Sequence, residues 1–346
     1  MSAVVAVVVT YNRKLLLMDC LEALARQTAP VARVVLVDNA STDGTEELVA
    51  GSGIAERLPI DYLRLRRNGG GAEGFHYGVR EALASASDWL WLMDDDCEPR
   101  DGCLERLLAA PPAADPSTAV LAPVVLEPGG ALLPINRGHV RPRWFFSSLV
   151  PATAAEHAAA AAPIGFCSFV GPLVHTSAAR RIGLPLREMF IRFEDVEYLD
   201  RLGPDDRMWL VGDAAIVHKD PQPVAGGGLR PRWREYRRPA AFADGWKLVY
   251  GVRNQIYAGR RGGWLSGPRA LSQVLVQAVR TLAFGDRRAR MLRLLAVYAL
   301  DGWRGRFRNV PPSRWPAMDE ALRYDVDPTT PVRHLRGAPS PPSRRA

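Results

Sequence analysis

The chain has 346 residues, a net charge of +8 and a hydrophobic content of 47%. These values describe an ordinary globular protein with room for one large domain and an appended part, or for two domains. The basic excess is almost entirely arginine and favours anionic partners such as nucleotide-sugar phosphates, lipid phosphates or a membrane surface. No base-reading module accompanies it, so we expect no nucleic-acid partner.

The cysteines and the apolar runs indicate the compartment. Cys20, Cys97, Cys103 and Cys167 form no CxxC pair, so the sequence predicts neither a zinc site nor a disulfide framework, which suits a reducing cytosol. Residues 1–10 lack the features of a signal peptide, and no apolar run reaches about 18 residues. We predict a cytoplasmic protein, with peripheral attachment at the cytoplasmic face of the membrane as an open alternative.

The first hundred residues alternate between strand and helix patterns. The predicted strands are residues 4–9, 34–37, 62–65 and 89–93, and the predicted helices are residues 15–26, 45–50 and 75–85. This order predicts an α/β fold with a doubly wound, mostly parallel sheet flanked by helices. Ligands of such sheets bind beyond the carboxyl ends of the strands. Tyr11, Asp38, Asn68 and Asp94 follow the four strands, so they should converge on one crevice.

The rest of the chain is less regular. Strand-like stretches cover residues 119–126, 166–174, 209–211 and 214–217, and residues 178–182 have a helical pattern. Residues 127–163 are predicted to be irregular, residues 221–239 a loop or lid, and residues 246–310 mainly helical. The prediction is therefore a first domain over residues 1–245, a helical C-terminal region over residues 246–336 and a disordered tail over residues 337–346.

An acidic triplet ends the fourth predicted strand. Asp94, Asp95 and Asp96 directly follow the apolar run of residues 89–93. Adjacent carboxylates beside a buried strand repel one another and lose hydration, and a cation offsets both costs. Carboxylates that hold a divalent metal with open positions suit binding of a substrate diphosphate. The plainer alternative is an acidic helix cap.

Two later positions suit the same site. Glu194 and Asp195 lie beside aromatic residues, where a carboxylate can acquire a raised pKa and act as a general base toward a hydroxyl. The alternative is an exposed helix start that favours acidic residues. His218 follows an apolar strand and would complete a mixed oxygen and nitrogen metal site, although a single histidine is more often structural.

Two weaker signals lie at the ends of the second and third strands. Asp38 could hydrogen-bond a ribose or a nucleobase, or could only cap the turn that follows it. Residues 68–74 contain four glycines and are predicted to be a loop. Such a loop lets backbone N–H groups approach phosphate, but a flexible turn has the same composition.

Taken together, these residues resemble the family-2 inverting glycosyltransferases of GT-A fold, over roughly residues 1–260. The resemblance rests on the segments of residues 8–13, 37–44 and 190–195, on the acidic triplet and on His218. The glycine-rich stretch of residues 68–75 is most similar to the branch of galactofuranosyltransferases and rhamnosyltransferases. Glu73 stands where that branch has a glycine.

The resemblance implies a role for each residue. Thr10, Tyr11 and Asp38 would hold the base and ribose, and Asp95 would contact ribose or sugar. The nucleotide-sugar site as a whole would comprise Thr10, Tyr11, Asn12, Arg13, Asp38, Asn68, Gly70, Asp94 and Asp95. The Mn²⁺ or Mg²⁺ ligands would be Asp94, Asp96 and His218. Asp195 would be the catalytic base, with Glu194 orienting a hydroxyl.

The implied reaction moves galactofuranose or rhamnose from a UDP- or dTDP-sugar to a hydroxyl of a glycan or of a polyprenyl-diphosphate-linked acceptor. The pathway would be cell-wall or surface polysaccharide synthesis, and a secondary-metabolite acceptor is the alternative. The arginine-rich C-terminal region, with Trp246, Trp264 and Trp303, resembles a membrane-surface helical region. A helical cap or a homo-oligomer contact explains the same pattern.

Two rival functions fit the sequence less well. A nucleotidyltransferase needs its glycine-rich loop after the first strand, where residues 10–13 contain no glycine. A non-catalytic nucleotide-sugar-binding protein would have lost the metal and base carboxylates, yet Asp94, Asp96 and Asp195 are all present.

Overall fold

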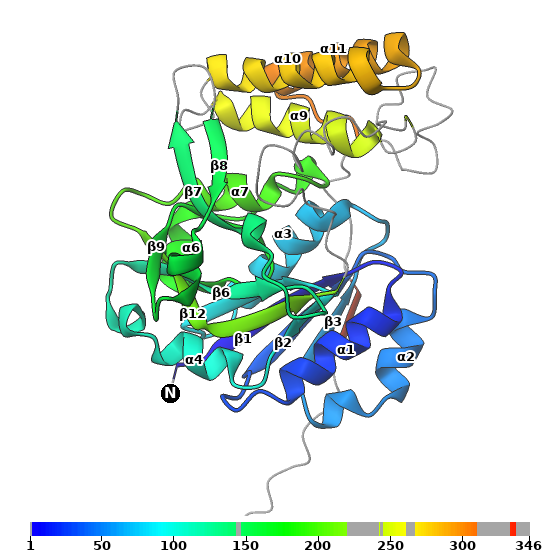
Figure 1. The fold of residues 1–346 in the computed structure, drawn as a ribbon. Coiled ribbons are helices and arrows are strands. Elements are labelled where there is room, and N and C mark those ends of the chain that lie inside the picture. The colour runs from blue at the N-terminus through cyan, green and yellow to red at the C-terminus, as the bar shows by residue number, and fades with distance from the viewer. Residues whose placement is uncertain are drawn as a thin grey trace, which may run out of the picture.

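A single large sheet flanked by helices forms the body of the molecule, and three helices make a further layer at one end (Figure 1). The computed structural model describes residues 2–142, 147–219, 242, 245–260, 267–309 and 333–336. The predicted lid at residues 221–239 and the predicted tail at residues 337–346 lie outside these residues. The strand order in the sheet is β13-β3-β2-β1-β4-β11-β6-β12-β5, and β9 pairs with β12.

The N-terminal half of the sheet is parallel, as predicted. Its strands are β1 (Val4–Thr10), β2 (Arg33–Asp38), β3 (Ile60–Arg64) and β4 (Trp89–Asp94). The helices between them are α1 (Lys14–Ala25), α2 (Thr45–Gly51) and α3 (Gly70–Leu83), with the 3₁₀ helix η1 (Ile54–Glu56). Every residue of β1 is buried, because helices cover both faces of the parallel strands.

The second half of the sheet is mixed. It contains β5 (Cys97–Pro99), β6 (Thr118–Leu126), β9 (Ala162–Ile164), β11 (Leu173–His175) and β12 (Arg207–His218). Its helices are α4 (Cys103–Ala109), α5 (Ala154–Ala158), α6 (Thr176–Ile182) and α7 (Glu194–Leu199), with the 3₁₀ turns η2 (Pro111–Ala114), η3 (Pro134–Asn136) and η4 (Arg187–Met189). A small second sheet joins β10 (Phe166–Cys167), β7 (Arg137–Pro142) and β8 (Ser147–Pro151).

The C-terminal region is mainly helical, with α9 (Gly245–Gly259), α10 (Gly267–Phe284) and α11 (Arg288–Arg304). The short strand β13 (Arg333–Arg336), which lies within the region predicted to be helical, pairs antiparallel with β3 at the edge of the main sheet. Within the described residues, every helix is too short or too polar to cross a bilayer.

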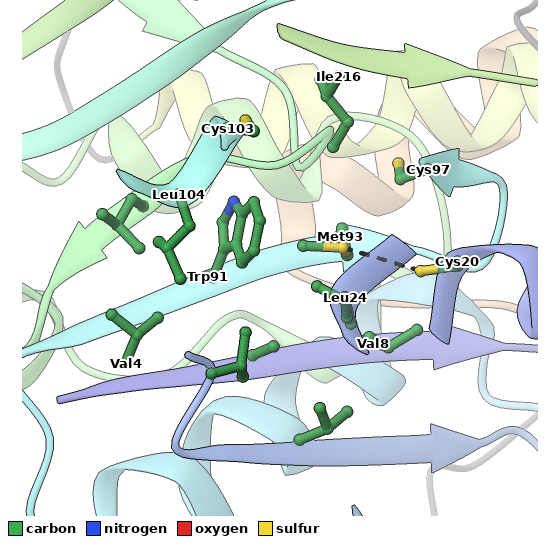
Figure 2. Packing of buried hydrophobic residues seen from close by; sticks show 14 of the residues in the cluster. Val4, Val8, Cys20, Leu24, Trp91, Met93, Cys97, Cys103, Leu104 and Ile216 are labelled. Atoms are coloured by element: carbon green, nitrogen blue, oxygen red, sulfur yellow. Dashed lines mark hydrogen bonds between the residues drawn. The ribbon is translucent and has the colours of Figure 1, made fainter. Parts of the chain in front are cut away.

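The core has a layer on each face of the sheet. Alternate residues of β1 serve opposite layers, with Val4, Ala6 and Val8 on one face and Val5, Val7 and Val9 on the other. Figure 2 shows the first layer, where Trp91 of β4 lies beside Leu104 of α4 and Met93 points to Cys20 of α1, with Cys20 Sγ 3.8 Å from Met93 Sδ. A third cluster packs α9 against α11 and includes Tyr250 and Tyr298.

One prediction about local structure is wrong in an informative way. Residues 70–74, predicted as part of a glycine-rich loop, form the first turn of α3. A Cβ at Gly74 would overlap Val9, and one at Gly78 would overlap Val7. These glycines therefore let the helix pack directly on β1, which a local sequence pattern does not reveal. Likewise, the predicted strand 166–174 is two strands, β10 and β11, separated by a turn in which Gly171 has φ +74°.

Candidate active site

The carboxyl ends of the parallel strands bring the predicted polar residues to one edge of the sheet. In the register of the sheet, Thr10 lies opposite Asp38 on one side, and Val9 lies opposite Asp94 on the other. The turn after β4 then carries the remaining two aspartates of the triplet. The sheet topology therefore places these residues together at one edge, as the strand order predicts.

The three carboxylates of the triplet have different partners. Asp95 accepts a hydrogen bond from Thr10 Oγ1 at 2.7 Å and one from the Tyr11 backbone at 3.4 Å. Asp96 accepts one from Arg13 Nη1 at 2.9 Å, and its other oxygen lies 3.3 Å from His218 Nε2. Strand β12 delivers His218 to this point because it pairs with β5, placing His218 opposite Cys97.

The pKa values of the triplet reflect crowding of negative charge. Burial raises the pKa of Asp94, and the charges of Asp96 and Asp95 raise it further. Burial likewise raises the pKa of Asp95 to about 6, against the hydrogen bond from Thr10. Burial also acts upward on Asp96, but its partners His218 and Arg13 hold the pKa of that carboxyl below its ordinary value.

This charge distribution fits a divalent cation. Arg13, with 40% of its side chain exposed, does not neutralise three carboxylates, and Nδ1 of His218 is buried with no hydrogen-bond partner among the described residues. The described residues contain no group of three or more His, Cys, Asp or Glu side chains arranged to hold a metal. The ligand set Asp94, Asp96 and His218 therefore stays a prediction.

A second carboxylate pair opens helix α7. Asp195 accepts a hydrogen bond from the Val196 backbone at 2.7 Å, whereas Oε2 of Glu194 is buried with no hydrogen-bond partner in the described part of the chain. Burial raises the pKa of Glu194 to about 8, and the Asp195 charge adds to that rise. Burial also raises the pKa of Asp195, but backbone N–H groups of Val196 and Phe169 oppose it. Burial therefore raises the pKa of both carboxyls, and the backbone N–H groups favour the charged form of Asp195.

Helix α3 connects the two acidic groups. The Ala72 backbone N–H donates to Phe190 O at 3.1 Å, and a Cβ at Gly71 would lie 3.2 Å from Glu194 Oε1. The charge of Glu194 also acts on the pKa of Asp94. Thus acidic residues a hundred positions apart in the chain lie close enough for their charges to interact.

Gly70 and Asn68 shape this contact. Gly70 has φ +79°, and a Cβ there would overlap Phe190 O, so only glycine suits the position. Asn68 Oδ1 accepts the Gly70 N–H at 2.8 Å and fixes the turn into the helix. Both residues have structural tasks, and their contact with a donor sugar stays a prediction.

The first loop has one exposed side chain and one that ties two loops together. Tyr11 is 42% exposed at the crevice, where a base could stack on it. Asn12, with φ 53°, donates its backbone N–H to Ser41 Oγ at 3.0 Å and accepts the Thr42 N–H on Oδ1 at 2.7 Å. Asn12 therefore holds the loop after β1 against the loop after β2.

Asp38 is more deeply buried than its predicted role suggests. Its carboxylate is fully buried and accepts hydrogen bonds from the Ser41 N–H at 2.7 Å, Tyr62 OH at 2.7 Å and Arg64 Nη1 at 3.1 Å. A nucleobase would have to displace one of these donors to reach it, so nucleotide contact by Asp38 stays a prediction. Sequence reasoning missed Tyr62 and Arg64, although their spacing of two along a strand places both on one face.

Comparisons with known proteins identify the fold and point to a family. The crystal structure of GalNAc-T7 with UDP, GalNAc and Mn²⁺ is similar to the chain, with a TM-score of 0.52 and 17% identity, covering 86% of this chain and 55% of that one. This similarity identifies the fold, which is GT-A, the fold of a class of glycosyltransferases. The model of glycosyl transferase family 2 matches residues 5–157. This segment of the chain is similar to that family of transferase enzymes.

Curated relatives fall in the predicted branch. The chain is 34% identical to galactofuranosyltransferase GlfT1 of Mycolicibacterium smegmatis over 58% of its length, and 37% identical to GlfT1 of Mycobacterium tuberculosis over 58%. It spans 65% and 64% of the lengths of these two relatives. The N-acetylglucosaminyl-diphospho-decaprenol L-rhamnosyltransferase of M. tuberculosis is 28% identical over 61% of this chain and 74% of that protein.

Proposed function

We propose that the protein is an inverting, metal-dependent glycosyltransferase that moves a sugar from a nucleotide-sugar to an acceptor hydroxyl. The observation that carries this proposal is the meeting of two acidic groups at one sheet edge. One is the crowded triplet of residues 94–96, and the other is the pair Glu194 and Asp195, whose pKa values are both raised by burial while backbone N–H groups favour the charged form of Asp195. The first suits a diphosphate with its cation, and the second suits a hydroxyl nucleophile.

The chemical step is a single displacement. Asp195 accepts the proton of the acceptor hydroxyl while the hydroxyl oxygen forms a bond to the anomeric carbon. The bond from that carbon to the nucleoside diphosphate breaks on the opposite face, which inverts the configuration. Glu194, protonated and without a partner for Oε2 among the described residues, donates a hydrogen bond to an acceptor or donor oxygen.

The proposed metal is Mn²⁺ or Mg²⁺, held by Asp94, Asp96 and His218. When bound, it neutralises the charge of the leaving diphosphate. Arg13 lies beside Asp96 and adds a positive charge to the same place. Thr10 and Tyr11 border the site from β1 and are proposed to hold the nucleoside.

The names of the relatives support the substrate proposal. UDP-galactofuranose and dTDP-rhamnose are the favoured donors, since relatives are named galactofuranosyltransferase and rhamnosyltransferase. The transferred sugar would be galactofuranose or rhamnose. One relative is named for an N-acetylglucosaminyl-diphospho-decaprenol acceptor, so a polyprenyl-diphosphate-linked glycan is the favoured acceptor here. The proposed pathway is cell-wall or surface polysaccharide synthesis at the cytoplasmic face of the membrane.

A transfer assay tests the function directly. The purified protein is incubated with UDP-galactofuranose or dTDP-rhamnose, Mn²⁺ and a prenyl-diphosphate-linked N-acetylglucosaminide, bare or rhamnosylated. We expect one pair to give a product whose anomeric configuration, read by NMR, is opposite to that of the donor. Retention would contradict the single displacement. If neither donor gives transfer, and neither gives a metal-dependent thermal shift, the proposed enzyme is contradicted.

The carboxylate pair predicts the pH dependence of kcat/KM. Asp195 must be ionised to accept a proton, and its pKa is raised, so activity should be lost on acidification above the ordinary aspartate value of about 4. Glu194 must be protonated to donate, so activity should also fall above about pH 8. In Glu194→Gln, which donates at every pH, the alkaline limb should disappear and the acidic limb should stay. An unchanged alkaline limb in that variant would contradict the assignment of Glu194.

Helix α10 carries an apolar stripe that supports peripheral membrane attachment. Leu271, Leu275, Val279 and Leu282 recur at helical spacing and are each at least 50% exposed. Residues 267–309 contain nine arginines and two aspartates, a net charge of +7. An apolar stripe within a cationic region fits the surface of a bilayer that contains anionic lipids.

A vesicle experiment tests this attachment. The protein should sediment with vesicles of phosphatidylglycerol and phosphatidylcholine, and less with phosphatidylcholine alone. Leu275→Gln should weaken sedimentation, whereas Leu15→Gln, which changes a leucine that is 72% exposed on α1, should not. Equal sedimentation of both variants would contradict membrane contact by α10. A dimer seen by light scattering and lost in Leu275→Gln would assign the stripe to a second copy instead.

A further inference from the structure

The segment just before the two catalytic carboxylates has an unfavourable backbone. Phe190, Arg192 and Phe193 have φ angles of 66°, 71° and 78°. The Ile191 N–H donates to Met189 O at 2.9 Å, which closes a tight three-residue turn around Phe190 with its ψ at −67°. Side chains with a Cβ adopt such angles only where the surroundings impose them. The contacts that impose them therefore decide where helix α7 begins and where its first residues point.

Asn254 of helix α9 makes three of these contacts. Its side chain is fully buried, and Nδ2 lies 3.0 Å from Met189 O, 3.2 Å from Ile191 O and 2.7 Å from Arg192 O. One amide group thus contacts three carbonyls within a stretch of four residues. To place these carbonyls on one amide, the backbone must curve around Asn254. The positive φ angles describe this curved conformation.

Arg253 fixes the orientation of that amide. Its Nε donates to Asn254 Oδ1 at 3.0 Å, which turns Nδ2 toward the carbonyls, and its Nη2 donates to Met189 O at 2.9 Å. Nη1 donates to Asn309 Oδ1 at 2.8 Å, and Asn309 Nδ2 donates to Glu188 O at 3.1 Å. The Arg253 guanidinium is fully buried. Every acceptor that the structure records for it within the described residues is a neutral oxygen, so shape and hydrogen bonding rather than ion pairing define this contact.

The opposite side of the segment is held by the catalytic domain. Phe190 O accepts the N–H of Ala72 at the start of α3, and the Phe190 ring packs edge-on against Trp246 and Tyr250 of α9. The segment therefore lies between helix α3 and the C-terminal helical layer, which is drawn above α3 in Figure 1.

We propose that Asn254, oriented by Arg253, is a positioning residue that holds the Met189–Phe193 backbone so that Glu194 and Asp195 face the acidic triplet. The proposal rests on the proposed function, because it assigns a purpose to the catalytic pair. It also implies that helix α9 helps to position the proposed base, Asp195.

The test compares an isosteric substitution with a control in the same helix. Asn254→Asp keeps the side-chain volume but replaces the Nδ2 donor by a carboxylate oxygen. That oxygen would then face the three backbone carbonyl oxygens and be repelled by them. We expect kcat to fall about 100-fold, as for a small misplacement of a reacting group, while KM for the donor changes less than about threefold. If Asn254→Asp fails to fold, Asn254→Ala, which only removes the amide, should show the same fall in kcat with the same small change in KM. Ile256→Ala removes buried apolar volume from α9 and should leave kcat nearly unchanged at an equal loss of thermal stability.

Hydrogen exchange separates this proposal from the proposed function. In Asn254→Asp the Glu197 amide, which donates to Phe193 O in the wild type, should exchange at least about tenfold faster than in the wild type and in Ile256→Ala. Unchanged exchange would overturn the proposal whether or not the enzyme is active. So would an equal loss of kcat in Ile256→Ala. If the wild type transfers no sugar, the proposed function fails, and the exchange rates alone decide whether Asn254 holds the segment.

Discussion

Replacing Asp195 by asparagine is expected to lower kcat by about 10³-fold, within the range that general-base catalysis contributes. The amide cannot accept the acceptor proton, so the hydroxyl must attack without losing it. Donor binding should persist, because the amide oxygen can still accept the Val196 N–H that Asp195 accepts at 2.7 Å. The measurements are kcat for transfer and the dissociation constant of the donor by calorimetry.

Two variants with the same kind of change make the result specific. Glu194→Gln keeps a hydrogen-bond donor where the carboxyl is protonated below about pH 8, so its loss of kcat at pH 7 should stay within about tenfold. Asp205→Asn removes an exposed carboxylate beyond α7 and should be silent. Full activity of Asp195→Asn would exclude Asp195 as the base. A larger loss in Glu194→Gln than in Asp195→Asn would exchange the two roles.

Removing divalent metal is expected to lower transfer at least about 100-fold, since charge neutralisation by a metal is worth several kcal/mol in the transition state. Adding Mn²⁺ or Mg²⁺ back should restore the rate. The physical reason lies in the triplet, where burial and mutual repulsion raise the pKa of Asp94 in the absence of a cation. Undiminished transfer after exhaustive chelation would contradict the metal assignment.

Asp94→Asn tests the same site without an assay of transfer. The raised pKa of Asp94 means that its charge opposes folding of the metal-free protein, so its removal should raise the melting temperature. The same change should abolish the additional thermal shift that Mn²⁺ and donor produce together. Asp205→Asn should alter neither quantity. A lower melting temperature together with a full metal-dependent shift would show that Asp94 is structural.

Patterning alone identified the architecture of the first hundred residues. Their strands are continuous apolar runs, which are typical of a parallel sheet covered by helices on both faces. The alternation of these strands with amphipathic helices leaves few possible topologies. Asp38 and the triplet were placed at the carboxyl edge for the same reason, since parallel strands end on the same side. The boundary of α3 was misjudged because glycine has a low helix propensity, and the packing of Gly74 and Gly78 on β1 outweighs that preference.

Local periodicity and short motifs in the sequence were enough to predict the α/β class, the acidic triplet at the edge of the sheet and the resemblance to family 2. The folded structure alone shows that burial and backbone N–H groups act differently on the pKa values of Glu194 and Asp195. It alone shows Asp38 buried beneath Tyr62 and Arg64, and it alone joins Asn254 to the segment before the base. Such contacts link residues about 24 to 65 positions apart, and folding rather than sequence proximity brings them together.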